Sequence, residues 1–482
     1  MEDCSLADAA LPRLQATMLT ALAARGWDVP EYARSGEPGV IHLGLGGFHR
    51  AHQALVFDAL LRQADTRWGV LGVGMNHAAL ADALAAQDGL YAVRVADHQG
   101  LRWQLGGAIW RTAVAAREPQ RVMAAIAAPG TRWVTLTVTE KGHGEQLANL
   151  LVGALQDRQA KAAGGLTIAS CDNQRGNGNA VRDLCLDEAR RRDPALAHWI
   201  TEACAFPNSM VDRIVPAATA DMLEQAAQAL EMQDAGAVGT EAFWEWVIED
   251  RFVDAGDADV LRRVGVRVVA DVLPFEDAKL RMLNGSHTAL ACIGAVLGLE
   301  HVHDCVADAR VEQFVRSFMS EDVGPQLTRA DWPAYRDALL QRFANPSLCH
   351  RVHQICLDTS QKIPQRWVAT ALAALGAGQL PQHLAFAAAA WIRYLRGVDE
   401  QGRAYALDDP MATALQALAR QHAGQPRQAV AALCTPVAIW GAELAVCARW
   451  LASVSHWLER IEQAGVHRAL DDLENGVRPD LT

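Results

Sequence analysis

The sequence predicts an α/β fold: an N-terminal Rossmann-like domain over residues 1–272, followed by a mainly α-helical domain over residues 273–482. Three observations predict it. An apolar strand runs into a glycine-rich turn near residue 44, strand candidates alternate with helical patterns up to about residue 272, and amphipathic helical patterns dominate thereafter. A chain of 482 residues is also longer than one ordinary hydrophobic core, which favours two or three domains.

The composition fits a soluble globular protein, because 51% of the residues are apolar and 21% are charged. The formal net charge of −12 and the lack of a basic block argue against a nucleic-acid partner. Residues 1–10 lack the features of a signal peptide, and no apolar run is long enough to span a membrane. The ten cysteines form no CxxC pair, which favours reduced thiols in a cytoplasmic protein, either a monomer or a small homo-oligomer.

The first strand is expected at Val40–Leu43, after a helical extension and a connector over residues 1–39. A tight turn follows, and helical spacing runs over Ala51–Leu61. In this strand–turn–helix arrangement, backbone N–H groups can hold a pyrophosphate. Because His49 replaces the third glycine of the usual GxGxxG motif, the turn by itself is a weak signal. The candidate cofactor-binding glycines are Gly44, Gly46 and Gly47.

A second strand is expected at Trp68–Gly72. The carboxyl end of this strand normally carries the acid that binds the adenosine ribose of NAD, but no acid precedes Asp82 here. Asn76 could hydrogen-bond either cofactor, and no arginine stands beside it to favour a phosphate. The residues themselves leave the choice between NAD and NADP open.

Three further strands are expected at Trp133–Thr139, Leu166–Ser170 and Val266–Val272, with helical patterns between them. This alternation predicts a mostly parallel sheet, on which ligands bind at the carboxyl ends of the strands. Polar clusters that could serve such a site, or be ordinary connecting loops, are Thr139-Glu-Lys-Gly142, Ser170-Cys-Asp-Asn173 and Phe206-Pro-Asn-Ser-Met-Val-Asp-Arg213.

A long helix is expected to begin at Pro274, whose missing N–H suits a first helical turn. It places Lys279, Asn284 and His287 in an apolar setting. A lysine that loses solvation favours its neutral form and can exchange protons near neutral pH. Asn284 offers an amide donor to a developing alkoxide, and His287 shares its helix face.

The spacing of this group sets a condition on its geometry. From Lys279 to His287 an α-helix rises about 12 Å, so the side chains converge only if Lys279 is extended or the helix bends at Gly285. The alternative is a buried helix whose lysine snorkels to solvent and whose histidine is a core residue.

After Pro274 the clearest amphipathic helices are Leu327–Arg342, Trp367–Leu375, Leu384–Leu395 and Leu444–Ala464. The segment His301-Val-His-Asp-Cys305 contains metal-ligating residue types, but it lacks a distant partner pair at a recognised zinc spacing. An ordinary helix connection is the favoured interpretation, and no metal is expected.

Four motifs together resemble the long-chain mannitol dehydrogenase family of polyol and sugar-acid dehydrogenases. They are Gly44-Leu-Gly-Gly-Phe-His-Arg-Ala-His52, Ser170-Cys-Asp-Asn173, Met210-Val-Asp-Arg-Ile214 and Lys279-x4-Asn284-x2-His287. The resemblance runs from His42 to about Gly402. It implies a metal-independent enzyme of carbohydrate metabolism that moves hydride between NAD and a secondary alcohol.

The resemblance also implies roles for individual residues. The lysine that matches Lys279 is the family's general acid/base, and the asparagines that match Asn173 and Asn284 polarise the carbonyl or alkoxide. The residues that match His287 and Asp212 orient substrate hydroxyls. The remaining assignments are Glu276, which would help to carry the proton to solvent, and the cofactor-binding residues Phe48, Arg50 and Asn76.

Within the family, the fructuronate reductase (D-mannonate oxidoreductase) branch is the first interpretation. Thr139–Gly142, Asn345-Pro-Ser-Leu348 and Ser360-Gln-Lys-Ile-Pro-Gln-Arg366 resemble that branch, as does Gln354, where mannitol 2-dehydrogenases tend to carry arginine. His143 departs from both branches, which usually have an aromatic residue there.

D-Fructuronate carries a carboxylate, so its site should hold a cation. The candidates are Lys362, Lys141 and Arg366, and Lys362 leads because it is expected in a polar turn that Pro364 ends. Two alternatives stay open: a mannitol 2-dehydrogenase acting on D-fructose and D-mannitol, or another polyol dehydrogenase, and a dinucleotide-binding sensor without catalysis. A sensor would not need a proton-transfer lysine.

Overall fold

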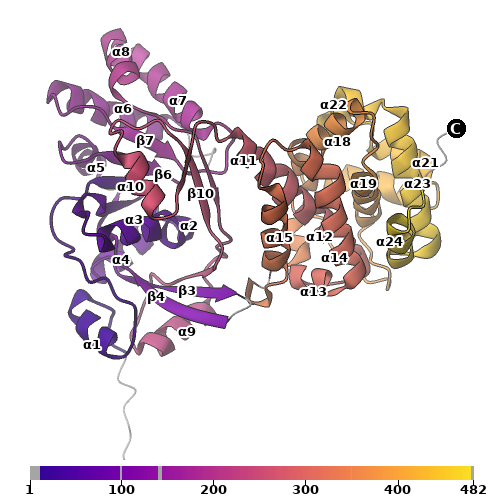
Figure 1. The fold of residues 1–482 in the computed structure, drawn as a ribbon, viewed down its shortest axis with the longest axis horizontal. Helices are drawn as coiled ribbons and strands as arrows, with labels where there is room; N and C mark the ends of the chain where they lie inside the picture. Colours follow the sequence, from indigo (N-terminus) through magenta and orange to yellow (C-terminus); the bar gives the residue numbers. More distant parts are fainter. Residues whose placement is uncertain (1–10, 98–99, 139–143, 349, 479–482) are drawn as a thin grey trace, which may run out of the picture. The chain divides into compact units, whose positions relative to one another are not determined.

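The computed structural model describes residues 11–97, 100–138, 144–348 and 350–478 (Figure 1). By internal contacts the chain forms two compact units, Met1–Leu273 and Pro274–Thr482. The first combines parallel strands with helices and the second is mainly helical, so the predicted fold class is confirmed.

The first unit contains a five-stranded parallel sheet in the order β5-β2-β1-β6-β7. Adjacent side chains of the central strand point to opposite faces, so Val40 joins one apolar core whereas Ile41 and Leu43 join the other. Helix α3 (Gln53–Arg62) covers one face, and α5 (Pro119–Ile126), α6 (Glu145–Ala160) and α7 (Asn177–Arg192) cover the other. The strands are β1 (Val40–Leu43), β2 (Val70–Gly74), β5 (Ile109–Val114), β6 (Trp133–Leu136) and β7 (Thr167–Ser170).

Two small sheets flank this core. One has the order β11-β10-β8 and the other β4-β3-β9. The strand expected at Val266–Val272 is the short β11 (Arg267–Val269), which pairs with β10 and not with the parallel sheet, so its expected place in that sheet was wrong. Its partial exposure explains the difference, because a strand of the parallel sheet is buried on both faces. The other strands are β3 (Tyr91–Asp97), β4 (Gly100–Gly106), β8 (Ser209–Asp212), β9 (Val238–Glu241) and β10 (Glu245–Glu249).

The second unit is built around α12 (Gly285–Leu297), in which every residue is buried. This helix packs against α19 (Gln382–Tyr394) and α16 (Val352–Ile355), and α19 packs on α23 (Ala448–Ala464). Among the described helices, none by itself is long and apolar enough to cross a membrane. One bent pair, α21 (Pro426–Leu433) with α22 (Val437–Ala445), meets that length and composition only when taken together.

Several expected helices differ in detail. The helix expected at Trp367–Leu375 is a π-helix, η8 (Pro364–Val368), followed by α18 (Ala369–Gly376). The helix expected at Leu327–Arg342 begins only at Trp332 and ends at Phe343, with Pro333 in its first turn (α15). Proline suits this position because a first turn leaves its N–H groups unpaired.

A buried ion-pair cluster links the last helix of the second unit to two earlier helices of that unit. His383 of α19 lies between two carboxylates: Asp322 of η5 (Phe318–Val323), 3.6 Å away, and Glu474 of α24 (Val466–Glu474), 3.2 Å away. Burial alone would lower the pKa of His383, but hydrogen bonding and attraction to the two carboxylates outweigh it and raise the pKa to about 9. The histidine is therefore a cation at neutral pH.

We expect His383→Gln to lower the melting temperature markedly at pH 6 and much less at pH 10. A histidine with a raised folded pKa stabilises the protein fully below its unfolded pKa, about 6.5, and this contribution disappears as the pH rises through the folded pKa, about 9. Thermal unfolding followed by circular dichroism measures it. His467→Gln, which removes a half-exposed partner of Asp308, is the control and should change little. A His383→Gln effect that is the same at both pH values would contradict the expectation.

Candidate active site

The turn after β1 has a backbone that only glycine tolerates. Gly44 has φ +107°, and a Cβ there would lie 2.7 Å from Thr137 Oγ1. Two side chains fix the carbonyl of Gly44: the Thr137 hydroxyl donates to it at 2.7 Å, and His42 Nε2 contacts it at 3.0 Å. Since the carbonyl is an acceptor, Nε2 donates, and Nδ1 accepts from the Thr135 hydroxyl at 2.8 Å.

This turn lies at the topological switch point of the parallel sheet. The chain moves from β1 to β2 on one side, and β6 lies on the other side of β1. In doubly wound folds, ligands bind outside the carboxyl ends of the strands at this point. Asn76 lies two residues beyond the end of β2 and is exposed, and no acid stands between that end and Asp82. The arrangement fits a dinucleotide with its phosphates at the Gly44 turn.

Residues of the short helix α2 (Gly47–Ala51) contact the turn and the neighbouring His42. His49, which replaces the third glycine, stacks on His42 with ring centroids 3.4 Å apart. Burial lowers the pKa of His42 to about 3 and that of His49 well below its ordinary value, so both rings are neutral. The buried guanidinium of Arg50 donates to the carbonyls of Gly46 and Gly236. Arg50 thus braces the turn.

The other cofactor candidate of this motif, Phe48, stacks on His52 at 5.0 Å. His52 separates α2 from α3, so the single helix expected over Ala51–Leu61 is broken there. The helix is interrupted because His52 has a φ of −127° and a ψ of −90°, which lie outside the helical region.

On the same unit, Asn177 joins the end of β7 to β8. Its side-chain amide donates to the carbonyls of Asp172 and Ser209 at 2.9 and 2.8 Å and accepts from the N–H of Ser209 at 2.9 Å. Asn173 is exposed in the loop held by this link, and Asp212 is buried at the end of β8. Asn177 was missed from the sequence, since an asparagine in a Gly-Asn-Gly-Asn stretch is also typical of a plain loop.

In the second unit, the candidate catalytic residues lie on an interrupted helix. Helix α11 (Leu273–Ala278) leads into the π-helix η4 (Lys279–Asn284), which continues as α12. In an α-helix, residues five apart point about 140° away from each other, because 3.6 residues make a turn. In a π-helix, backbone hydrogen bonds join residues five apart. Lys279 and Asn284 therefore lie one turn apart, at neighbouring positions on the helix surface.

Of the two conditions that the spacing set, a bend at Gly285 is not observed. Gly285 has helical φ and ψ of −65° and −52°, and the irregularity is the wider π turn before it. Trp367 Nε1 donates to the carbonyl of Gly285 at 3.0 Å, and Arg366 donates to the carbonyl of Asn284 at 3.2 Å. These bonds from η8 hold the junction between η4 and α12.

His287 lies in a buried aromatic and cationic environment. Its ring stacks on Phe343 at 5.0 Å and meets the edge of His350 at 5.0 Å. Burial and the positive charges around it hold the pKa of His287 well below the ordinary value, so the imidazole is neutral. Its Nε2 atom is buried without a hydrogen-bond partner in the part of the chain that the structure describes, which makes it a candidate to bind a ligand.

Three cations act on this histidine: Lys362, Arg366 and the buried Arg342 of α15. Lys362 lies in a short helix, α17 (Thr359–Ile363), that runs on through Pro364 into η8, so the expected polar turn ended by Pro364 was wrong. Proline fits within this helix because it stands in the first turn of a π segment. Lys362 Nζ donates to the carbonyl of Ile355 at 3.1 Å, which leaves two of its three donors.

The remaining candidates are distributed as follows. Glu276 is buried on α11, three residues before Lys279. Gln354 on α16 is exposed, and Lys141 lies outside the described residues. Arg342 and His350 were missed, because an arginine in an amphipathic helix and a histidine in a loop carry no motif. Both were found only because the fold packs them around His287.

Comparison with known proteins adds independent evidence. The chain matches the models of the mannitol dehydrogenase Rossmann domain over residues 38–260 and of the mannitol dehydrogenase C-terminal domain over residues 271–462. A D-mannonate oxidoreductase of Escherichia coli (strain K12) is 39% identical over 81% of this chain and 87% of that protein. A mannitol 2-dehydrogenase of Phaeosphaeria nodorum is 36% identical over 92% of this chain and 82% of that protein.

A solved structure is similar over nearly the whole length. The mannitol 2-dehydrogenase of Pseudomonas fluorescens, in a ternary complex with NAD and D-mannitol, has a TM-score of 0.79 and 30% identity to this chain. The match covers 96% of this chain and 100% of that one.

We expect Gly44→Ala to lower the free energy of unfolding by about 1–3 kcal/mol and to abolish dinucleotide binding, because the new Cβ strains the backbone and displaces Thr137. Chemical denaturation and a fluorescence titration with a reduced nicotinamide dinucleotide measure the two effects. Gly26→Ala is the matched control: its φ is +86°, but nothing lies within 4 Å of the added Cβ. This control should be strained yet bind normally. Equal binding by both variants would show that the turn does not hold the ligand.

Proposed function

We propose, from the premise that this chain belongs to the mannitol dehydrogenase family, that it interconverts a secondary alcohol and a ketone on a sugar acid or polyol with NAD. Members of this family are oxidoreductases that act on CH–OH groups. D-Fructuronate/D-mannonate is the proposed substrate pair. D-Fructose/D-mannitol is the second candidate, because a mannitol 2-dehydrogenase matches a larger share of the chain.

The Gly44 turn at the switch point supports a dinucleotide cofactor, and the family relative that was solved with NAD supports the choice of nucleotide. When bound, NAD supplies the hydride acceptor. We propose a modest preference for NAD over NADP, since no arginine adjoins Asn76 in the sequence at the end of β2 to bind a 2′-phosphate.

The π turn carries the catalytic proposal. It places Lys279 and Asn284 one turn apart, with His287 following on α12. In the oxidation, Lys279 accepts the hydroxyl proton as the C–H electron pair leaves as hydride and the C–O bond becomes C=O. Asn284 and Asn173 donate amide hydrogen bonds to the oxygen as charge develops on it. Glu276, buried on the same helix, then relays the proton from Lys279.

The amino-acid usage of the chain supports this assignment. Of its 44 lysine and arginine residues, only four are lysines, namely Lys141, Lys161, Lys279 and Lys362. Three of the four are site candidates. Arginine stays protonated in proteins, whereas lysine can lose its proton when it is partly buried. The chain uses arginine almost everywhere. A lysine at position 279 therefore fits the proposal that a base is required there.

The cations around His287 support the sugar acid. Lys362 and Arg366 are partly buried, and burial lowers the pKa of both; that of Arg366 falls to about 10, so Arg366 remains a cation at neutral pH. Taking cations out of water is unfavourable unless an anion or hydrogen-bond acceptors compensate. A substrate carboxylate would compensate them, whereas fructose carries no charge. Asp212 and the neutral His287 are proposed to orient the substrate hydroxyls.

We expect Lys279→Ala to reduce turnover by about 10²–10⁴-fold and to leave NADH affinity nearly unchanged, because the variant loses proton transfer but not the cofactor turn. The assay is NADH oxidation with D-fructuronate and with D-fructose, repeated with NADPH. Lys161→Ala removes an exposed lysine of the first unit and should behave like the wild type. Near-native turnover by Lys279→Ala would refute the assignment. A wild-type protein that binds NADH but reduces no ketose or keto-acid would instead favour the sensor.

We expect Lys362→Met to lower kcat/KM for fructuronate by about 10–200-fold, the equivalent of about 1.5–3 kcal/mol for a charge-assisted hydrogen bond. The slow reaction with fructose should hardly change. Lys161→Met controls for the loss of a lysine. Equal losses for both substrates would place Lys362 at the shared polyol end, and a wild-type preference for fructose would select the mannitol 2-dehydrogenase alternative.

A further inference from the structure

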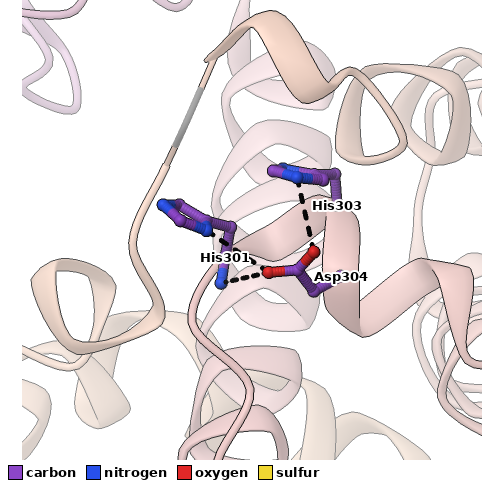
Figure 2. A group of neighbouring side chains, drawn as sticks. All are labelled: His301, His303 and Asp304. Atoms are coloured by element: carbon purple, nitrogen blue, oxygen red, sulfur yellow. Dashed lines mark hydrogen bonds and ion pairs between the residues drawn. The ribbon is translucent and has the colours of Figure 1, made fainter.

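Three metal-ligating side chains meet at the start of α13 (Val302–Ala307). His301 is the N-cap of this helix, and His303 and Asp304 lie in its first turn. One ligand atom from each lies within 4.8 Å of the other two. Figure 2 shows both imidazole rings turned toward the Asp304 carboxylate. All three residues are partly exposed, so an ion could reach them.

The separations are close to those around a single ion, although the site is not fully preformed. His301 Nδ1 lies 3.3 Å from one Asp304 oxygen, and His303 Nε2 lies 3.4 Å from the other. Metal–ligand bonds of about 2.0–2.2 Å place neighbouring ligand atoms of a tetrahedron about 3.3–3.6 Å apart. The two rings are nearly parallel, 5.2 Å between centroids and 19° between planes. Because an ion lies in the plane of each imidazole that binds it, side-chain rotation must turn the rings toward a common point when an ion binds.

Helix capping explains only part of this arrangement. The Asp304 carboxylate accepts from the backbone N–H of His301 at 3.0 Å, and the His301 side chain accepts from the backbone N–H of Asp304, which together form a capping box. His303 is not part of that box; its Nε2 atom faces Asp304, and its Nδ1 atom is buried without a hydrogen-bond partner among the described residues. Cys305, the other ligand type in this segment, is turned into the core. Burial raises the pKa of its thiol to about 12, so it stays a protonated thiol.

The charge around the cluster suits a cation. Glu300 lies 4.0 Å from His301 Nε2, and its charge is shared with Arg351, 2.8 Å away. Asp304 adds a second carboxylate in direct contact with both rings. Two imidazoles with a carboxylate are ligands that Zn²⁺ and its neighbours in the transition series accept.

We propose that His301, His303 and Asp304 form a peripheral binding site for a divalent transition-metal ion of the zinc class, with the fourth coordination position open to water. The site is independent of the proposed dehydrogenase reaction, whose chemistry needs no metal. Spacing along the sequence missed it because all three ligands come from four consecutive residues, without the distant pair of a structural zinc site.

The position of the site gives it a route to the residues around His287. His301 forms a short antiparallel bridge with Arg351, and the N–H of Val302 donates to the carbonyl of His350 at 2.9 Å. The ring of His350 meets that of His287. A metal ion that fixes His301 would therefore also restrain the backbone that carries His350.

The test is calorimetric titration of the full chain with Zn²⁺ at neutral pH, and we expect one ion per chain. His303→Gln should weaken binding by at least about tenfold, because losing even an outer-sphere partner of a metal site typically costs 10–100-fold. Far-ultraviolet circular dichroism confirms folding of the variant. The matched control is His467→Gln, since His467 pairs with Asp308 at 2.8 Å without a second imidazole. It should bind Zn²⁺ like the wild type.

Co²⁺ provides a second readout that does not depend on protein activity. The tetrahedral ion absorbs strongly in the visible range, and this absorption should appear in the wild type and in His467→Gln but not in His301→Gln or His303→Gln. Unchanged Zn²⁺ affinity in His303→Gln would overturn the proposal. An equal loss in His467→Gln, or no binding by the wild-type chain, would overturn it as well.

Discussion

The π-helical turn at Lys279–Asn284 is the constraint on which the proposed chemistry of this protein depends. A regular α-helix would direct these two side chains about 140° apart, so one of them would face the core. The π turn corrects the spacing at the cost of regular helical hydrogen bonds. The side chains of Arg366 and Trp367 return hydrogen bonds to the carbonyls at its end, and they come from η8, itself a π segment. Two irregular segments thus stabilise each other.

Burial controls the charge of the histidines in both units. His42 and His49 beneath the glycine turn and His287 on α12 lie among apolar or positive groups, which disfavour a further positive charge. These neutral rings can accept or donate a hydrogen bond without repelling a ligand. His383 is buried to a similar degree, yet it is cationic, because two carboxylates face it. Burial thus lowers the pKa of each ring, and two facing carboxylates reverse that effect at His383.

In the first unit, hydrogen bonds to the backbone fix the conformation of the glycine turn. Gly44 adopts a conformation that other residues rarely adopt, and its carbonyl is held by His42 of β1 and by Thr137, which follows the end of β6. Arg50, a candidate cofactor-binding residue, braces this turn through two backbone carbonyls. The turn is thereby fixed before any ligand binds, which reduces the ordering that binding requires.

The sequence by itself predicted the fold class and the first strand, and it named the candidate reactive residues. Val40–Leu43 was found residue for residue, and the two-part architecture followed from local periodicity, which depends only on near neighbours. Tertiary structure decided the rest. The π turn is accompanied by hydrogen bonds from η8, some 80 residues away. Strand β11 pairs with β10 and therefore lies outside the parallel sheet. Packing brings Arg342 and His350 to His287. Such long-range contacts leave no periodic trace in the chain, because each depends on partners that are close only after folding.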